Sequence, residues 1–343
     1  MARVHFLNVG NGDCSIIQHA TGRVTVIDVN KARRPEIGKS ASFESRIVSL
    51  SAGGGGNFNQ RLSPVNPIEH MQYHKIDSIF RFILTHPDMD HMDGIKDLFE
   101  IFSPINFWDT ANNCKKDRDG FSSSPYRYED WQFYQKLRAG QLGSPKYLNY
   151  TSESARVNFW DADGLYILSP SASLVQQANS SSDYNDCSYV ILYYSNSGRK
   201  VIFAGDSHDA TWEHILTTQS KLISNVDLLI APHHGRKSDR RYNFLDVLRP
   251  KLTLFGVAPS EHLAYQPWTN RDLPYITNNQ AGSVIMDMDN GYVYVTNEAF
   301  ARRENPSTQF DQSYGGYFLK KILTDAEKQQ QDILNRLRTD RAG

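Results

Sequence analysis

The stretch FILTHPDMDHMDG, residues 82–94, decides the fold because an apolar strand runs directly into a loop crowded with ionisable groups. Its first residues predict a strand that is covered on both faces. The loop then brings His86, Asp88, Asp90 and His91 within six positions. A turn that caps the next helix accounts for one or two aspartates but not for both histidines. We therefore expect a metal-binding loop at the end of this strand.

Two later segments have the same character. KVIFAGDSH (200–208) places Asp206 after an apolar strand, and LLIAPHHGRKSD (228–239) places His233 and His234 after another. Loops at the carboxyl ends of strands are where open sheets present ligand sites. Imidazole suits zinc, manganese or iron, and carboxylate oxygens add affinity for hard ions. The pattern predicts that the three loops meet at one site for two metal ions.

Composition limits the class of protein. Of the 343 residues, 39% are apolar and 22% are charged, which is typical of a globular chain. The formal net charge is -1, so no global basic field indicates nucleic acid or membrane, and a polyanionic partner needs local chemistry. Three scattered cysteines do not form a disulfide framework. With no secretory leader at the start and no apolar window of membrane length, we expect a cytoplasmic protein with no membrane association.

Short strand patterns alternate with helical patterns along the chain, which predicts sheets covered by helices. We expect one domain over residues 1–300 and an extension over 301–343. Residues 31–75, with glycines at 53–56, read as a mobile insertion. Residues 104–160 read as an aromatic insertion, either a small satellite core or a wall on which a base stacks. Apolar residues at helical spacing from 319 to 337 predict an amphipathic terminal helix that docks on its own domain or contacts a partner or second copy.

The three motifs resemble those of the metallo-β-lactamase superfamily. HPDMDH is similar to its His-x-His-x-Asp-His signature, with Asp88 in place of the second histidine, and FAGD and APHHG follow in the family order. NVGNGD (8–13), VIDV (26–29), NDCSYVIL (185–192) and the segment 275–295 resemble, more narrowly, the soluble hydrolase domain of bacterial DNA-uptake competence channel proteins and its stand-alone relatives. The resemblance covers roughly residues 2–30, 76–103 and 165–297.

The resemblance implies an αββα sandwich of two mixed sheets with a hydrolase site for two divalent ions, zinc or manganese. His86 and Asp88 would hold the first ion, and Asp90 and His91 the second. Asp206 would bridge them around a shared nucleophilic water, which Asp90 also orients. One of His233 and His234 would be a further ligand, with a slight preference for His233.

Departures from the family pattern leave two roles open. Where the family has its middle histidine motif, this chain has Asn185, Asp186 and Cys187, so that Asp186 is an oxygen substitute at most. More oxygen donors move the metal preference from zinc toward manganese or magnesium. A family histidine before a proline is Gln266 here, and His262 is a candidate general acid or a surface histidine.

Several residues around the motifs have expected supporting roles. Asp13 is expected to be structural, Asp28 to orient a ligand imidazole, and Asp93 to cap the helix that follows. Lys237 and Ser238 lie in a basic cluster with Arg236, Arg240 and Arg241. This cluster reads either as a solvated helix face or as a phosphate clamp that binds substrate.

These features favour a metal-dependent phosphodiesterase or nuclease that acts on nucleic acid or nucleotides. One alternative is a hydrolase of a small ester, thioester, lactone, lactam or phosphate ester. Another is a defence or signalling component that acts mainly through a partner protein. Fold alone does not decide between them.

Overall fold

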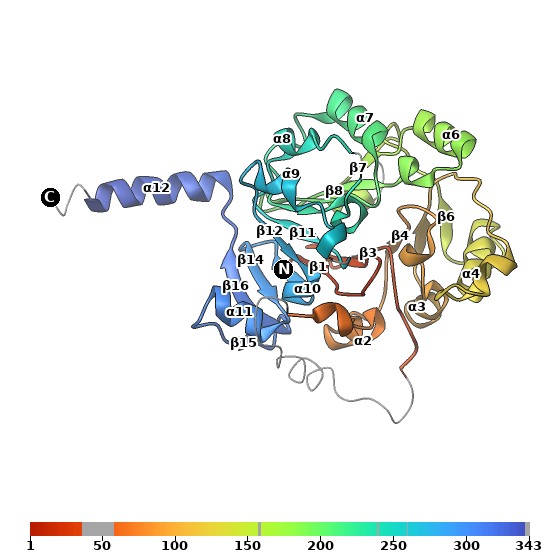
Figure 1. Cartoon of the computed structure of the whole chain (residues 1–343), viewed down its shortest axis with the longest axis horizontal. Coiled ribbons are helices and arrows are strands. Elements are labelled where there is room, and N and C mark those ends of the chain that lie inside the picture. Colours follow the sequence, from red (N-terminus) through yellow and green to blue (C-terminus); the bar gives the residue numbers. More distant parts are fainter. Residues whose placement is uncertain (36–57, 157–158, 239, 259, 340–343) are drawn as a thin grey trace.

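Two mixed β-sheets face each other in the computed structural model, which describes residues 1–35, 58–156, 159–238, 240–258 and 260–339 (Figure 1). Among these residues the larger sheet has ten strands in the order β15-β16-β14-β13-β1-β2-β3-β4-β5-β6. The smaller has six in the order β12-β11-β10-β9-β8-β7. The strands of the larger sheet are β1 (Arg3–Phe6), β2 (Ser15–Gln18), β3 (Val24–Ile27), β4 (Arg81–Ile83), β5 (Asn106–Trp108), β6 (Lys146–Leu148), β13 (Val284–Asp287), β14 (Tyr292–Val295), β15 (Phe310–Asp311) and β16 (Gly316–Lys321). Those of the smaller sheet are β7 (Leu165–Ser169), β8 (Val190–Tyr194), β9 (Lys200–Phe203), β10 (Leu228–Ile230), β11 (Thr253–Phe255) and β12 (Tyr275–Thr277).

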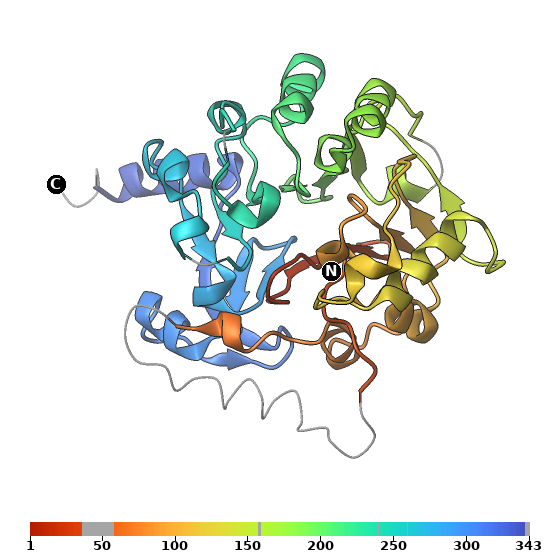
Figure 2. The same cartoon turned by 45° about the vertical axis from the view of Figure 1, so that its right-hand side comes forward.

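Helices cover the outer face of each sheet (Figure 2). The helices of the described residues are α2 (Pro67–Tyr73), α3 (Ile95–Phe102), α4 (Tyr128–Arg138), α5 (Phe159–Ala162), α6 (Ala172–Ser181), α7 (Asp209–Gln219), α8 (Phe244–Leu248), α9 (Tyr265–Thr269), α10 (Asn278–Ala281), α11 (Glu298–Glu304) and α12 (Asp325–Thr339), of which α12 covers neither sheet. Phe82 of β4 packs outward toward α3, whereas its neighbour Ile83 lies in the core between the sheets. Apolar side chains on both faces explain why the central strands read as continuous apolar runs. The predicted αββα sandwich of two mixed sheets is confirmed.

The aromatic insertion at 104–160 extends the larger sheet with β5 and β6 and adds α4. Trp131 and Tyr134 of α4 are buried in one cluster with Phe99 and Phe107. The satellite-core interpretation therefore fits most of these aromatics, because they pack against the sheet. In the other insertion, residues 67–73 form α2, while the glycines at 53–56 lie outside the described residues.

The end of the chain differs from the sequence expectation. The terminal helix begins at Asp325, not near Leu319, because residues 316–321 pair with β14 as β16. Leu319 and Ile322 are buried there, so their helical spacing was misleading. α12 extends away from the rest of the molecule in Figure 1 and leaves Ile333 and Leu334 about half exposed. The domain boundary at residue 300 stays a prediction. Among the described residues, none of the helices has the length and apolar character needed to cross a membrane.

Candidate metal centre

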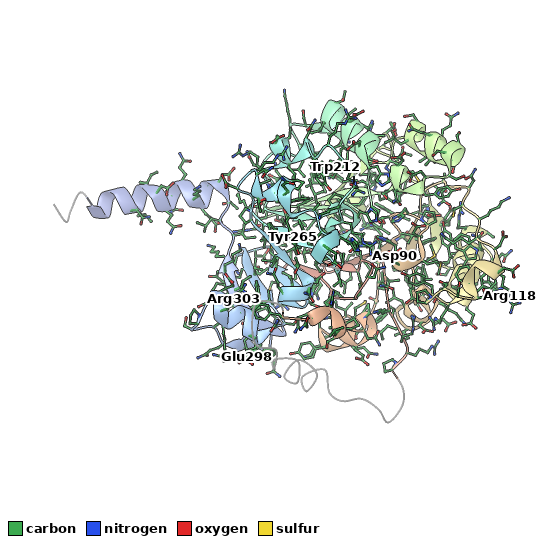
Figure 3. All side chains as sticks on the ribbon, viewed as in Figure 1. Asp90, Arg118, Trp212, Tyr265, Glu298 and Arg303 are labelled. Carbon is green, nitrogen blue, oxygen red and sulfur yellow. The ribbon has the colours of Figure 1, made fainter. Side chains whose placement is uncertain are left out.

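Four loops meet at one edge of the sandwich, where Asp90 lies near the middle of the view in Figure 3. Three of these loops follow β4, β9 and β10, and the fourth joins β1 to β2. The parallel neighbours β9 and β10 bring their carboxyl ends together, and His233 N donates to the Gly205 carbonyl oxygen at 2.9 Å across their loops. Gly12 permits the close approach of the β1–β2 turn, because a Cβ there would overlap the Asp90 carbonyl oxygen.

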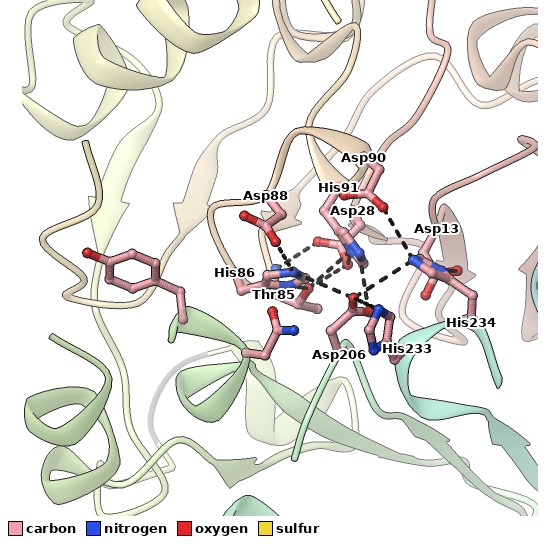
Figure 4. A network of polar contacts seen from close by, with 12 residues as sticks. Asp13, Asp28, Thr85, His86, Asp88, Asp90, His91, Asp206, His233 and His234 are labelled. Atoms are coloured by element: carbon pink, nitrogen blue, oxygen red, sulfur yellow. Dashed lines mark hydrogen bonds and ion pairs between the residues drawn. The ribbon is translucent and has the colours of Figure 1, made fainter. Parts of the chain in front are cut away.

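Asp206 lies at the hub of the group (Figure 4). Its Oδ1 is 3.3 Å from His91 Nε2, and its Oδ2 is 3.8 Å from both His86 Nε2 and His234 Nε2. Asp90 reaches the same space, with its Oδ2 3.4 Å from His234 Nε2. The structure thus brings together side chains that the sequence places up to 148 positions apart (86 to 234).

The outer nitrogen of each of three histidines fixes its orientation. His91 Nδ1 is 2.8 Å from Asp28 Oδ2, and His234 Nδ1 is 2.9 Å from Asp13 Oδ1. His86 Nδ1 is 3.0 Å from Thr85 Oγ1, which in turn donates to Asp28 Oδ2 at 2.7 Å. A proton on Nδ1 in each ring leaves the Nε2 lone pair facing the centre.

The atoms that face the centre fit a divalent metal ion. His86 Nε2, His91 Nε2, His234 Nε2 and Asp206 Oδ1 are buried and have no hydrogen-bond partner. Such orphaned polar atoms are costly unless something binds them. The ligand atoms of Asp90, His91 and His234 lie within 4.8 Å of one another, as do those of His86, His91 and Asp206. Imidazole and carboxylate donors of this kind suit zinc and manganese.

The charges of the group are strongly coupled. Burial opposes protonation of His234, but Asp13 and Asp206 raise its pKa to about 10. Burial would raise the pKa of Asp206, yet His91 and His234 hold that pKa well below its usual value. Without a metal, the neighbouring carboxylates thus favour the protonated form of His91 and His234. A divalent cation would balance these carboxylates instead.

The half of the centre that the sequence assigns to the first ion is the poorer one. Asp88 Oδ2 is 3.6 Å from His86 Nε2, but its Oδ1 is 3.1 Å from the ammonium of Lys116. Its side chain is 44% exposed, whereas His91 and His234 are buried. The half with Asp90, His91 and His234 therefore has the more complete ligand set. Occupation by two ions stays a prediction.

The two adjacent histidines differ in what they can offer a metal. Arg240 Nη2 lies 3.3 Å from His233 Nδ1 and can only donate, so His233 carries its proton on Nε2. That Nε2 is 3.6 Å from Asp206 Oδ2. His234 instead turns a lone pair inward. The geometry therefore favours His234 as the ligand, against the slight sequence preference for His233. Both have left-handed backbone, with φ of 53° and 56°, which is strained for histidine.

Asp186 lies apart from the central group. Its Oδ1 is 3.6 Å from His208 Nδ1, which is also 3.4 Å from Asp183 Oδ2. These three carboxylate and imidazole groups form a second cluster. His208 connects it to the centre, because its ring centroid is 6.4 Å from that of His233. Asp186 thus does not stand among the central ligand atoms as a replacement for the missing histidine.

His262 and the basic cluster lie beside the centre rather than in it. His262 is exposed, and its carbonyl oxygen accepts from Lys237 N at 2.7 Å. Lys237 and Ser238 are also exposed on the loop after η5 (Pro232–Gly235). Arg240, in contrast, is buried and donates to the Asp206 carbonyl oxygen at 3.1 Å. The cluster read from the sequence is therefore divided between solvent and the interior.

Three contributions escaped the sequence reading. Lys116 comes from the aromatic insertion, and only the fold reveals its contact with Asp88. The carboxylate of Asp13 contacts His234 Nδ1 and so orients this distant histidine, in addition to any structural role in its own turn. The expectation that Asp93 caps α3 is wrong: Gly94 is the N-cap, and Asp93 accepts two bonds from Arg33 Nη2 at 2.8 and 2.7 Å. An arginine 60 residues away gave no local signal.

No family model and no curated protein matches the chain. Solved structures do, among them a metallo hydrolase from the hyperthermophilic archaeon Ignicoccus hospitalis, at 12% identity and a TM-score of 0.45 over 83% of this chain and 99% of that one. An isothiocyanate hydrolase from Delia radicum gut bacteria matches at 12% identity and 0.45, over 83% and 98%. The metallo-beta-lactamase fold protein YhfI from Bacillus subtilis matches at 10% and 0.41, over 80% and 95%. Values this low leave the activity to be argued from the site itself.

Proposed function

We propose that the chain is a metal-dependent hydrolase whose preferred substrates are phosphodiesters, in nucleic acid or in nucleotides. The observation that carries the proposal is the set of four buried, unpartnered ligand atoms that converge from the loops after β4, β9 and β10. A folded protein has no packing reason to aim three imidazole nitrogens at one carboxylate and leave them unsatisfied.

A bound divalent ion would lower the pKa of water and polarise the ester group that is attacked. The chain's own residues would do the positioning. Asp28 and Asp13 fix the ring orientations of His91 and His234. The side chain of Asp90 is 22% exposed, so it lies where the centre opens to substrate and can orient a water. His233 presents an Nε2 proton beside Asp206, where it can hydrogen-bond an oxygen of the substrate.

The preference for phosphodiesters rests on the surroundings of the metal-binding loop. A pocket beside it is lined by Met89, Lys116, Arg118, Phe121 and Ser124 together with Asp117, Asp119 and Gly120. Lys116 and Arg118 can bind phosphate oxygens, and Phe121 offers an aromatic surface to a base. Lys237 adds an exposed cation on the loop after η5.

The test compares hydrolysis of phosphodiesters with hydrolysis of other classes of substrate. Purified protein is assayed with zinc or manganese against bis(4-nitrophenyl) phosphate, 4-nitrophenyl acetate and a chromogenic β-lactam, and against single-stranded DNA and RNA. We expect the phosphodiesters to be hydrolysed, and Asp206→Asn to lose at least about a hundredfold in rate because a charged ligand is removed. Asp272→Asn, an exposed carboxylate that belongs to none of the carboxylate and imidazole clusters of the described residues, serves as the matched control.

Turnover of the acetate or the lactam with no phosphodiester cleavage would replace the proposed substrate class by the small-ester alternative. Equal rates for wild type and Asp206→Asn on every substrate would refute the proposal that this centre is a hydrolase site. Arg118→Gln provides a further check, because loss of a phosphate contact should raise KM for the phosphodiester more than for the acetate.

We also propose that α12 mediates association with a partner protein or a second copy of the chain. The supporting observation is that Ile333 and Leu334 are 51% and 49% exposed on a helix that extends from the body. Apolar side chains at adjacent positions on such a helix are normally covered. Light scattering of the full chain and of a chain ending at residue 323 tests this. A shorter chain that keeps both the oligomeric state and every partner of the full chain would refute it.

A further inference from the structure

A second histidine cluster lies on the outer face of the larger sheet. His5 belongs to β1, His70 to α2, and His74 follows α2 directly. His70 and His74 are four residues apart, a spacing that places two side chains on the same face of a helix. None of these residues belongs to the central group.

The three imidazoles are close enough to share one ion. His5 Nδ1 is 3.0 Å from His70 Nε2, and the ring of His74 lies 4.7 Å from that of His5 and 4.4 Å from that of His70, between centroids. One nitrogen from each ring lies within 4.8 Å of the other two. Tetrahedral metal sites with ligand distances of about 2.0–2.1 Å need nitrogens separated by roughly 3.4 Å.

The orientation of the rings also suits a metal ligand. His5 Nε2 is 3.0 Å from Gln18 Oε1 on the neighbouring strand, so an amide oxygen holds the proton on that nitrogen. The Nδ1 lone pair of His5 then faces the other rings, as in metal-binding histidines that are oriented through their second nitrogen. His74 Nε2 is buried and has no hydrogen-bond partner.

The side chains of His5 and His70 are fully buried, so water does not compete with a metal ion for their ring nitrogens. A pocket lined by Arg3, Tyr73, His74, Lys75, Gln312 and Ser313 gives His74 access to solvent. Its two cations would attract an anion or polarised water as a fourth ligand.

We propose that His5, His70 and His74 form a second metal site, for a divalent transition-metal ion of the zinc type, which ties β1 to α2. With nitrogen donors alone, the site should select zinc, nickel or cobalt over manganese, magnesium and calcium. The site is independent of the central group and of any hydrolase activity. Its role is structural, because metal binding adds to the stability of the fold that holds the ligands.

The experiment counts metal ions in the full-length protein. Protein stripped with a chelator is reloaded with zinc and dialysed, and zinc per chain is measured by mass spectrometry for wild type, His74→Ala and Gln72→Ala. Gln72 is an exposed neighbour on α2 and is the matched control. We expect His74→Ala to hold one zinc fewer than wild type and Gln72→Ala to hold the same number. The same loss of one zinc should appear when the comparison is repeated in an Asp206→Asn background, so a defective central group cannot mimic it.

A second measurement needs no variant. Crystals of the wild-type protein grown with zinc should show an anomalous scattering peak within coordination distance of the three rings, and zinc should raise the melting temperature of wild type more than that of His74→Ala. Equal zinc content in His74→Ala and Gln72→Ala, or an anomalous map with no peak between the rings, would show that the cluster is a hydrogen-bonded core trio and overturn the proposal.

Discussion

Each inward-facing imidazole of the central group is held by its second nitrogen, and that contact decides what the ring can do. Asp28, Asp13 and Thr85 accept hydrogen bonds from the Nδ1 atoms of His91, His234 and His86, respectively. Arg240 does the reverse to His233, although His233 and His234 are adjacent in sequence. Through these neighbours His234 turns a lone pair toward the centre, whereas the adjacent His233 turns an N–H toward it.

Asp28 offers a test of this arrangement. It accepts from His91 Nδ1 at 2.8 Å and from Thr85 Oγ1 at 2.7 Å, and so orients two ligand histidines. We expect Asp28→Asn to weaken metal binding by about 10- to 100-fold, since an amide does not hold the proton on Nδ1 as strongly. Competition with a chromogenic chelator measures the change. An affinity equal to that of wild type, with the exposed Asp272→Asn as control, would contradict the assigned role.

Lys116 offers a second test at this scale. Its ammonium lies 3.1 Å from Asp88 Oδ1, where it competes with a cation for that carboxylate. We expect Lys116→Gln to strengthen binding of the manganese ion beside His86 and Asp88, the more weakly held of two, by roughly tenfold and to leave the more tightly held ion unchanged. Calorimetric titration with manganese measures both affinities, and manganese is not expected to bind the cluster of His5, His70 and His74. Lys115→Gln, an exposed neighbour, should behave as wild type. Tightening of the more tightly held ion instead would contradict the place of Lys116 beside the weaker half of the centre.

At this scale, the sequence predicts the site residues that lie close together in the chain better than those whose partners are distant. His86, Asp90 and His91 share one short loop, and their spacing alone indicates metal binding. The choice between His233 and His234 depends on Arg240 and on Asp13, which is 221 positions from His234. No local pattern records such a contact.

At the scale of elements, predictions were best where a strand is buried on both faces. The helix expected after Gly94 appears as α3, and the strand before Asp206 appears as β9. The sequence predicts helix where β16 forms, because Leu319 and Ile322 also fit a helical spacing, but pairing with β14 overrides that preference. Three-residue strands such as β6 carry too few residues for any period to show.

The end of β2 gives a prediction about acid stability. His19 Nε2 lies 2.9 Å from Thr25 Oγ1, and burial, only partly offset by Asp163, lowers the pKa of His19 from 6.5 to about 4. Between these values the unfolded chain binds a proton that the folded chain does not, so stability falls as pH falls from 6.5 to 4. The loss from this group is up to about 3 kcal/mol.

We therefore expect His19→Gln to flatten the decrease in unfolding free energy between pH 7 and pH 4.5, measured by urea denaturation at both values. The variant need not be more stable at pH 7, because a buried hydrogen bond is altered there. His262→Gln changes an exposed histidine and serves as control. A His19→Gln slope that is as steep as that of wild type would show that this histidine does not contribute.

At the scale of the whole molecule, the larger sheet joins strands that lie far apart in the sequence. β1 lies between β2 and β13, and Arg3 is paired with Asp287. The sequence predicted the two-sheet sandwich but not which strands are neighbours. A register between residues so far apart is set by the packing of the whole core and by no short segment.

Truncation tests the importance of the pairing between β1 and β13. A chain ending at residue 283 lacks β13, β14 and β16, so β1 loses one of its two neighbours and part of the core between the sheets is exposed. We expect it to lose cooperative unfolding in urea, followed by tryptophan fluorescence. A chain ending at residue 328 lacks most of α12 but keeps Glu327, the partner of the buried Arg199, and should unfold like the full chain. Cooperative unfolding of the shorter chain would mean that β1 needs only β2.

The pairing of β1 with β13 also has a consequence for how the protein is made. Val284 of β13 follows its partner Phe6 of β1 by 278 positions, so one edge of β1 stays open while the ribosome makes the residues between them. Hydrogen bonds between distant segments are slow to form, and an open edge invites pairing with other chains. The larger sheet is therefore completed only after this long intervening segment has been made, and chaperones that shield exposed strand edges should matter more for its yield than the rate of any local folding step.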